Sequence, residues 1–189
     1  MNRAISEERS FSLMRPPGHH ASADRLGGFC YFNNIAVAVT KALEKFGKVA
    51  ILDFDCHHGN GTQAVFLKNE RVLYVSWHQI YIYPGTGYES ESNCLNYPMP
   101  PGADHEAFWQ LFEKGLHRVE EFNPELIAVS AGFDSYIGDP LTMLRFQKKT
   151  YEGIGEKIKS FAVPTFAVLE GGYGVEFAEC VFEFLQGFF

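Results

Sequence analysis

The sequence predicts a single α/β domain, spanning residues 1–189, in which helices cover both faces of a central and mainly parallel sheet. Short and almost continuous apolar runs, such as residues 49–54 and 126–131, are typical of strands buried on both faces of a parallel sheet. Segments with the apolar spacing of helices, such as residues 35–46, alternate with these runs, as connections between parallel strands require.

The first expected elements are each bounded by a turn or a stop signal. A strand at residues 11–14 is closed by Arg15-Pro16-Pro17-Gly18, in which two prolines and a glycine favour a turn. A helix at residues 35–46 buries one apolar face and ends before Gly47. The elements expected after it are a strand at 49–54, a strand at 71–77, a helix at 105–122, a strand at 126–131, a helix at 144–161, a strand at 165–169 and a helix at 175–186.

Composition excludes several classes of protein. Hydrophobic residues make up 46% of the chain and aromatic residues 15%, which is ample for a core and argues against disorder. The net charge of −7 disfavours binding to nucleic-acid phosphates, which requires clustered Lys and Arg. The longest apolar runs fall well short of the roughly 20 residues that span a bilayer. Residues 1–10 are polar and contain no apolar signal segment, so a cytoplasmic protein without membrane contact is expected.

The four cysteines form no C-x-x-C pair and no recognisable disulfide framework, so we expect reduced thiols in the core or in loops.

Polar residues follow four of the predicted strands. In parallel α/β sheets, ligands bind beyond the carboxyl ends of the strands, so chemistry is expected there. The four strand ends that carry polar or catalytic residue types are 53–59, 77–78, 131–134 and 170–173.

Asp55, His57 and Asp134 form a candidate metal site. Residues i and i+2 of a strand point to the same side, so Asp55 and His57 can face one ion. Asp134, at the end of another strand, supplies a third ligand, and three protein ligands with an open position are typical of catalytic zinc. Manganese and ferrous iron accept the same ligands. Taken alone, D-x-H is common by chance, and Asp134 could instead cap the following helix.

Two adjacent histidines, His19 and His20, supply the base that a metal-bound water requires, although such pairs are more often structural. Asp53 lies on the same strand side as Asp55 and could orient one histidine through its Nδ1–H, and the amide oxygen of Asn60 could orient the other.

Tyr173 follows two glycines, Gly171 and Gly172, which allow the backbone to approach the site closely. Its phenol could donate to the oxyanion that forms when water attacks a carbonyl. Without other evidence, a Gly-Gly-Tyr segment is more often a turn.

Seven motifs follow one another along the chain and together carry a resemblance to a known family: Arg15-Pro16-Pro17-Gly18-His19-His20-Ala21, Gly28-Phe29-Cys30-Tyr31-Phe32-Asn33-Asn34, Asp53-Phe54-Asp55-Cys56-His57-His58-Gly59-Asn60-Gly61-Thr62-Gln63, Tyr83-Pro84-Gly85-Thr86-Gly87, Ala131-Gly132-Phe133-Asp134, Gly138-Asp139-Pro140 and Glu170-Gly171-Gly172-Tyr173. The sequence resembles the histone deacetylase superfamily, which includes acetylpolyamine amidohydrolases and acetoin-utilisation proteins, and is most similar to its class II and bacterial branches. The resemblance begins at about Phe11 and continues to the C-terminus, and it implies an arginase-like three-layer α/β/α fold.

The resemblance implies a role for each matching residue around one catalytic Zn²⁺. Asp55, His57 and Asp134 correspond to the zinc ligands. His20 corresponds to the general base and His19 to an electrostatic partner or proton donor, with Asp53 behind His19. Tyr173 corresponds to the tyrosine that stabilises the transition state. Asn60 stands where some members have an Asp, and its neutral amide should leave His20 less basic than a carboxylate would.

The resemblance also implies substrate and cation contacts. Phe29 and Tyr83 match the aromatic pair that encloses the stem of an acyl-lysine, and the Gly28 carbonyl matches an acceptor of the substrate amide N–H. Gly172 is expected at the same substrate site. A monovalent cation, K⁺ or Na⁺, is expected at Asp53, Asp55, the main-chain oxygen of His57, Ser76 and the carbonyl of Trp77.

Family members usually carry a further segment before the Arg-Pro-Pro-Gly-His-His motif, which supplies strands and a rim loop, whereas ten residues precede Phe11 here. We therefore expect an N-terminally short domain with exposed apolar surface. That surface is expected to be covered by self-association to a homo-oligomer or by a partner.

The expected function is zinc-dependent hydrolysis of an amide in an acetyl-lysine peptide, an acetylpolyamine or another small acylated amine. One alternative is a catalytically weak metal- or ligand-binding fragment, or a subunit of a larger assembly. Another is an arginase-like dimanganese hydrolase, which would require further carboxylates at the strand ends.

Overall fold

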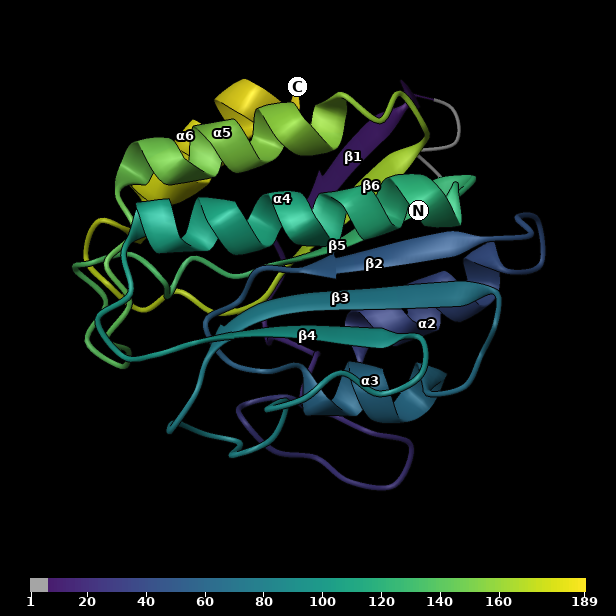
Figure 1. The fold of residues 1–189 in the computed structure, drawn as a ribbon, viewed down its shortest axis with the longest axis horizontal. Helices are drawn as coiled ribbons and strands as arrows, with labels where there is room; N and C mark the ends of the chain where they lie inside the picture. Colours follow the sequence, from purple (N-terminus) through teal and green to yellow (C-terminus); the bar gives the residue numbers. More distant parts are fainter. Residues whose placement is uncertain (1–6) are drawn as a thin grey trace.

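The computed structural model of the chain describes residues 7–189. In it, six parallel strands form one sheet in the order β1-β6-β5-β2-β3-β4 (Figure 1). Residues 1–6, part of the polar N-terminal stretch, lie outside the described residues. The strands are β1 (Arg9–Ser12), β2 (Val49–Asp53), β3 (Val72–Gln79), β4 (Cys94–Met99), β5 (Leu126–Ala131) and β6 (Thr165–Leu169). The helices are α2 (Asn34–Ala42), α3 (Asn60–Phe66), α4 (His105–Phe122), α5 (Lys148–Lys159) and α6 (Phe177–Phe188).

Helices cover the sheet on both faces, which confirms the predicted three-layer α/β/α class. α4, α5 and α6 pack on one face, over the larger of two cores, which contains aromatic side chains such as Phe108, Tyr151 and Phe184. α2 and α3 lie on the other face, over a smaller core that contains Ile35 and Phe66 (Figure 1). The central strands β2, β3 and β5 are buried along their whole length, as continuous apolar runs predict.

Two elements were not expected from the sequence. α3 begins inside the polar motif that follows β2, where glycines and a histidine pair suggest a loop. β4 contains Pro98, which disfavours a strand interior, and β4 is accordingly the edge strand beside β3.

Several predicted boundaries also differ from the structure. The largest differences are at two helices, since α2 ends at Ala42, four residues before the predicted end at Phe46, and α5 begins four residues late. The first strand lies two residues earlier, at Arg9–Ser12, and the last helix two residues later, at Phe177–Phe188. α5 begins at Lys148 rather than at Leu144, because the residues before it are extended and form single bridges at Arg145 and Phe146.

Capping residues position the helices nearest the site. The side chain of Asn33 accepts from the Ala36 N–H (2.9 Å) at the start of α2, and its amide donates to the Ala21 carbonyl (2.8 Å). These two contacts tie the segment that follows the His19-His20 pair to the helix. Asp104 caps α4 in the same way through the N–H of Ala107 (3.0 Å).

The carboxyl ends of the parallel strands meet on one side of the molecule, at the left of Figure 1. The register pairs Asp53 at the end of β2 with Ser76 of β3 and with Ser130 of β5. This arrangement brings the polar residues that follow β2, β5 and β6 to one place. No helix within residues 7–189 is long and apolar enough to cross a membrane.

Gly155 allows α5 and α6 to pack at backbone contact, and this contact gives a test of the fold. A Cβ at Gly155 would lie 2.7 Å from the Phe184 carbonyl oxygen and 2.7 Å from the Phe188 nitrogen, and neither backbone atom can move aside cheaply. Gly155→Ala should lower the free energy of unfolding by about 2 kcal/mol despite the better helix propensity of Ala. Denaturant titration measures this change. The exposed neighbour Glu156 provides the control, and Glu156→Ala should stay within about 0.5 kcal/mol of wild type. Equal stability of all three proteins would contradict the packing described.

Candidate metal and active site

Three side chains converge at the ends of β2 and β5. The ligand atoms of Asp55, His57 and Asp134 lie within 4.8 Å of one another. His57 Nδ1 lies between the two carboxylates, 3.2 Å from Asp55 Oδ1 and 2.8 Å from Asp134 Oδ2. Both aspartates are buried, whereas the His57 side chain remains 13% exposed. Two buried carboxylates and an imidazole around one point are a donor set that suits a divalent cation.

Glycines make room for these carboxylates. A Cβ at Gly132 would lie 2.1 Å from Asp55 Oδ2, and one at Gly171 would lie 2.5 Å from Asp134 Oδ2. The backbone also holds the carboxylates in place, because the Gly171 N–H donates to Asp55 Oδ2 (2.7 Å) and the Cys56 N–H donates to Asp134 Oδ1 (2.8 Å). The β6 end therefore contributes to the triad through its main chain.

Proton affinities in the triad reflect its negative charge. Burial opposes protonation of His57, but the hydrogen bonds to Asp134 and Asp55 prevail and raise its pKa to about 10. Burial and the nearby charge of Asp55 raise the pKa of Asp134 to about 6. Burial would raise the pKa of Asp55 as well, but His19 and His57 outweigh it and hold that pKa low. Without a metal, the imidazolium of His57 supplies the positive charge that the carboxylates require.

The adjacent histidines have different partners. His19 Nδ1 lies 3.0 Å from Asp53 Oδ2, and His20 Nδ1 lies 2.8 Å from Asn60 Oδ1. Burial disfavours the charged form of His19, but Asp53, Asp55 and Glu170 raise its pKa well above the usual range. Burial, followed by repulsion from His19, lowers the pKa of His20 to about 3. His20 is thus a neutral imidazole beside a cationic one, with the ring centroids 4.1 Å apart.

Tyr173 is held from two sides. Its N–H donates to Asp139 Oδ2 (2.7 Å), and the Arg15 guanidinium lies 5.3 Å from its ring centroid. The same guanidinium donates to the carbonyl of Gly172 (2.7 Å), which fixes the turn before the tyrosine. Burial and the charges of Asp55 and Asp134 raise the pKa of the phenol, which therefore stays protonated and can act as a hydrogen-bond donor.

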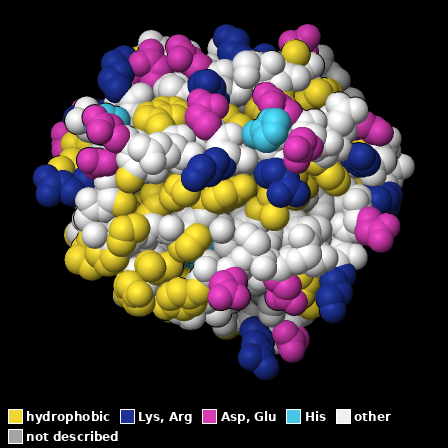
Figure 2. Space-filling view, viewed as in Figure 1, with side chains coloured by type: hydrophobic (Ala, Val, Ile, Leu, Met, Phe, Trp, Pro, Cys, Tyr) yellow, Lys and Arg dark blue, Asp and Glu magenta, His cyan; other side chains and the backbone are white. Residues whose placement is uncertain are grey.

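A pocket of about 310 Å³ opens beside these groups. It is lined by His20, Gly28, Phe29, His57, Ile82, Tyr83, Leu141 and Tyr173. The rings of Phe29 and Tyr173 are 5.8 Å apart, and Tyr83 packs edge-on against His20 at 4.9 Å. Gly28 lies so close to His20 that a Cβ would fall 2.2 Å from its ring. Figure 2 shows hydrophobic side chains gathered at the lower left, the side on which the strands end.

Two of the residues expected at a monovalent cation lie beside each other in the neighbouring strands β2 and β3. Asp53 and Ser76 are register partners, and both are buried. The Ser76 hydroxyl is 2.8 Å from His78 Nδ1. Trp77 is buried, and its indole N–H donates to the Leu111 carbonyl (2.9 Å), so only its main chain is available on the site side of the strand.

Three further residues shape the site without having been assigned a role from the sequence. Glu170 is fully buried and accepts from the N–H groups of Gly18 (2.7 Å) and His19 (3.1 Å), which anchors the histidine pair to the end of β6. Burial raises its pKa to about 7. Arg15 and Asp139 hold Tyr173 as described above. All three lie inside motifs visible in the sequence, but only the coordinates show which group each one contacts.

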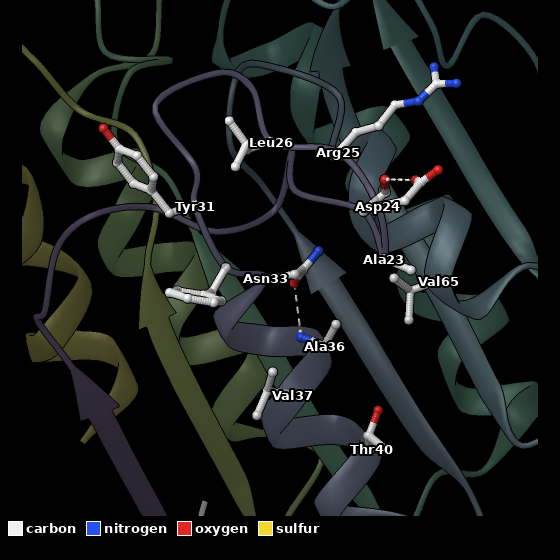
Figure 3. A pocket seen from close by; sticks show the side chains of 12 residues that line it. Ala23, Asp24, Arg25, Leu26, Tyr31, Asn33, Ala36, Val37, Thr40 and Val65 are labelled. Atoms are coloured by element: carbon white, nitrogen blue, oxygen red, sulfur yellow. Dashed lines mark hydrogen bonds between the residues drawn. The ribbon is translucent and has the colours of Figure 1, made fainter.

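A second hollow lies away from the triad, on the α2 and α3 side of the sheet. Figure 3 shows it between the loop of residues 22–33 and the first turns of α2, with Leu26, Tyr31 and Val37 along its wall. Its volume is about 590 Å³. An adjoining hollow of about 530 Å³ shares Phe32 and Val37 with it and reaches Val168 of β6. The side chains of Phe32 and Val37 are 77% and 67% exposed, so this face of the molecule is apolar and open.

The fold and the strand-end site define an arginase- and deacetylase-type α/β protein. The solved structure of acetylpolyamine aminohydrolase from Burkholderia pseudomallei superposes with a TM-score of 0.93 at 34% identity, covering 98% of this chain and 57% of that one. The histone deacetylase domain matches residues 1–187. The chain belongs to the histone deacetylase family, as its motifs predict.

Curated relatives agree with this assignment. A probable deacetylase of Archaeoglobus fulgidus is 41% identical over 183 residues, which cover 89% of this chain and 51% of the relative. Acetylpolyamine amidohydrolase 2 of Pseudomonas aeruginosa is 39% identical over 182 residues, covering 88% of this chain and 52% of the relative. The chain therefore spans about half the length of the relatives it matches.

Metal uptake by the triad should release protons. His57 must give up its Nδ1 proton to bind a metal, and with a pKa of about 10 it carries that proton at pH 7.5. Titration of the metal-free protein with Zn²⁺ should therefore release about one proton per ion, and the apparent affinity should rise with pH. Calorimetry in buffers of different ionisation enthalpy measures this release. A binding enthalpy independent of the buffer at pH 7.5 would contradict the assignment of His57.

Proposed function

We propose that this chain carries a zinc-dependent amidohydrolase site that removes acetyl or other acyl groups from amines. The convergence of Asp55, His57 and Asp134 beside the His19-His20 pair is the observation that carries the proposal. The names of the relatives, among them acetylpolyamine amidohydrolases and probable deacetylases, support the same chemistry. The proposed substrates are small acylated amines and acetyl-lysine in a peptide.

Asp55, His57 and Asp134 would hold the ion in this proposal. Zinc, when bound, polarises a carbonyl and lowers the pKa of a water molecule. One group of three such ligands occurs within residues 7–189, which supports a single ion over the dimanganese alternative. We also propose that K⁺ or Na⁺ binds near Asp53 and Ser76, because these buried residues are neighbours in register.

The proton chemistry follows from the histidine partners. Asn60 Oδ1 accepts the Nδ1 proton of His20, which leaves Nε2 with a free lone pair. A neutral His20 can therefore take a proton from the attacking water. The cationic His19 beside it favours negative charge in the transition state, and a histidine of the pair protonates the leaving amine.

Tyr173 acts on the acyl oxygen in this scheme. Its phenol remains protonated and lines the same pocket as His20 and His57. Donation to the developing oxyanion stabilises the transition state more than the ground state. Phe29 and Tyr83 line the pocket and would enclose the stem of the acylated amine, whose amide N–H the Gly28 carbonyl would accept.

A second candidate function rests on the length of the relatives. Because the chain spans about half of each, it could serve as a metal- or ligand-binding module, or as a subunit of a larger assembly. Stoichiometric zinc binding without turnover on a broad panel of acylated amines would favour this function. Turnover by the chain alone would exclude it.

Variants of Tyr173 and Asp134 test the proposed hydrolysis. Tyr173→Phe removes one oxyanion donor and should lower acetate release from acylated amines about a hundredfold. Asp134→Ala removes a metal ligand and should abolish both zinc binding and turnover. Tyr97→Phe removes a phenol hydroxyl from β4, away from the pocket, and should leave the rate unchanged. Circular dichroism verifies folding of each protein. Wild-type turnover in either of the first two variants would refute the proposal.

We further propose that a second copy of the chain covers the apolar face around Phe32 and Val37. Exposed contiguous apolar surface of this kind commonly marks an association site. Sedimentation velocity should show concentration-dependent self-association, and Val37→Asp should weaken it. Val175→Asp alters a fully exposed valine before α6 and should have no effect. A monodisperse monomer at all concentrations would contradict self-association.

A further inference from the structure

Two buried histidines outside the candidate metal triad lie side by side, against the loop of residues 80–93 that joins β3 to β4 and carries Tyr83. His58 is 2% exposed and His78 is fully buried, and their ring centroids are 4.7 Å apart. His58 lies just before α3, and His78 lies near the end of β3. The proposed proton chemistry uses neither of them.

His78 connects the sheet to the loop. Its Nε2 lies 2.9 Å from the carbonyl oxygen of Gly87, which can only accept, so this nitrogen carries the proton. Its Nδ1 therefore accepts from the hydroxyl of Ser76 at 2.8 Å. One imidazole thus joins β3 to the main chain of the loop through two hydrogen bonds.

His58 connects α3 to the same loop. Its Nε2 donates to Gln63 Oε1 (2.9 Å), which also accepts from the Asn96 amide (2.9 Å). Its Nδ1 then accepts from the hydroxyl of Thr86 (2.8 Å). Every polar atom of both rings has a partner, and two of the four partners, Thr86 and Gly87, lie on consecutive residues of the loop.

The loop rests directly on both rings at Gly87. The φ of Gly87 is +78°, in the left-handed region. A Cβ on Gly87 would lie 2.6 Å from His58 Cγ and 2.6 Å from His78 Nε2. Only glycine permits this approach without displacing the rings. Four residues before this point, Tyr83 lines the pocket and packs edge-on against His20.

We propose that His58 and His78 are positioning residues, which hold Thr86 and Gly87 and thereby set Tyr83 against His20 as one wall of the substrate pocket. This inference rests on the proposed function, in which Tyr83 encloses the stem of the acylated amine. The exposure of the tyrosine side chains of this loop supports the proposal that hydrogen bonds anchor it. Tyr81, Tyr83 and Tyr88 are all exposed, so none of these three aromatic side chains anchors the loop in the core. Loss of the anchor should affect substrate binding more than the chemical step.

Thr86→Val provides the mildest test, because it replaces one hydroxyl on an exposed residue by a methyl group and leaves the core intact. Thr86→Ser keeps the hydroxyl and is its matched control. Loss of one hydrogen bond should raise the KM for an acylated amine about fivefold, with kcat changed less than twofold. Thr86→Ser should behave as wild type.

His78→Phe gives a stronger test, because it keeps a ring and removes both of its hydrogen bonds. His78→Gln retains a terminal amide that can donate to the Gly87 carbonyl, so it should recover part of the lost affinity. His117→Phe alters an exposed histidine of α4 and controls for the substitution itself. If His78→Phe does not fold, the two Thr86 variants decide the question.

Limited proteolysis with chymotrypsin gives a readout that needs no turnover. The aromatic residues Tyr81, Tyr83 and Tyr88 make the loop a substrate once it opens, and cleavage within residues 81–88 should be about fivefold faster in Thr86→Val. Zinc stoichiometry should stay at the wild-type value. Failure of the wild type to hydrolyse any amide would refute the proposed function but leave this measurement valid. Unchanged KM and unchanged cleavage in folded Thr86→Val and His78→Phe would overturn the positioning role.

Discussion

Four carboxylates are buried at one edge of the sheet, and the site is organised by their need for compensating partners. Asp53, Asp55, Asp134 and Glu170 are at most 1% exposed. A buried carboxylate is tolerated only when hydrogen bonds or positive charges replace its hydration. Backbone N–H groups supply much of this compensation, and His19 and His57 supply the positive charge. A divalent cation at the triad would take over the charge that His57 provides in its absence.

This constraint links segments that are distant in the chain. Glu170 at the end of β6 fixes the backbone of Gly18 and His19, and Asp55 at the end of β2 accepts from Gly171. The same parallel register that buries the strands therefore brings the acid, base and phenol of the proposed reaction together. Beyond this set, the neutral His58 and His78 extend the network to the loop that carries Tyr83. Hydrogen bonds to Thr86 and Gly87 thus hold the loop, and the ring contact between Tyr83 and His20 joins the pocket wall to the charged floor.

Much of this arrangement follows from sequence, and the exceptions have physical causes. The buried strands were predictable because continuous apolar runs indicate two covered faces, and the strand-end position of Asp55, His57 and Asp134 followed from the strand period. α3 was missed because its first residues, Asn60 and Gly61, have low helix propensity, and β4 was missed because Pro98 argues against a strand. Glu170 and Arg15 act on main-chain groups more than 150 residues away in the chain, and no local pattern reveals such contacts.

Direct observation of a bound ion would test the account most closely. Zinc-soaked crystals, with anomalous scattering measured at the zinc absorption edge, should contain one strong peak about 2.0–2.2 Å from Asp55, His57 and Asp134 together. The His57 contact should be made by Nδ1, the atom that lies between the two carboxylates. A second ion of equal occupancy at the strand ends, or a peak that leaves any one of these three side chains unbound, would contradict the single-ion site on which the proposed chemistry depends.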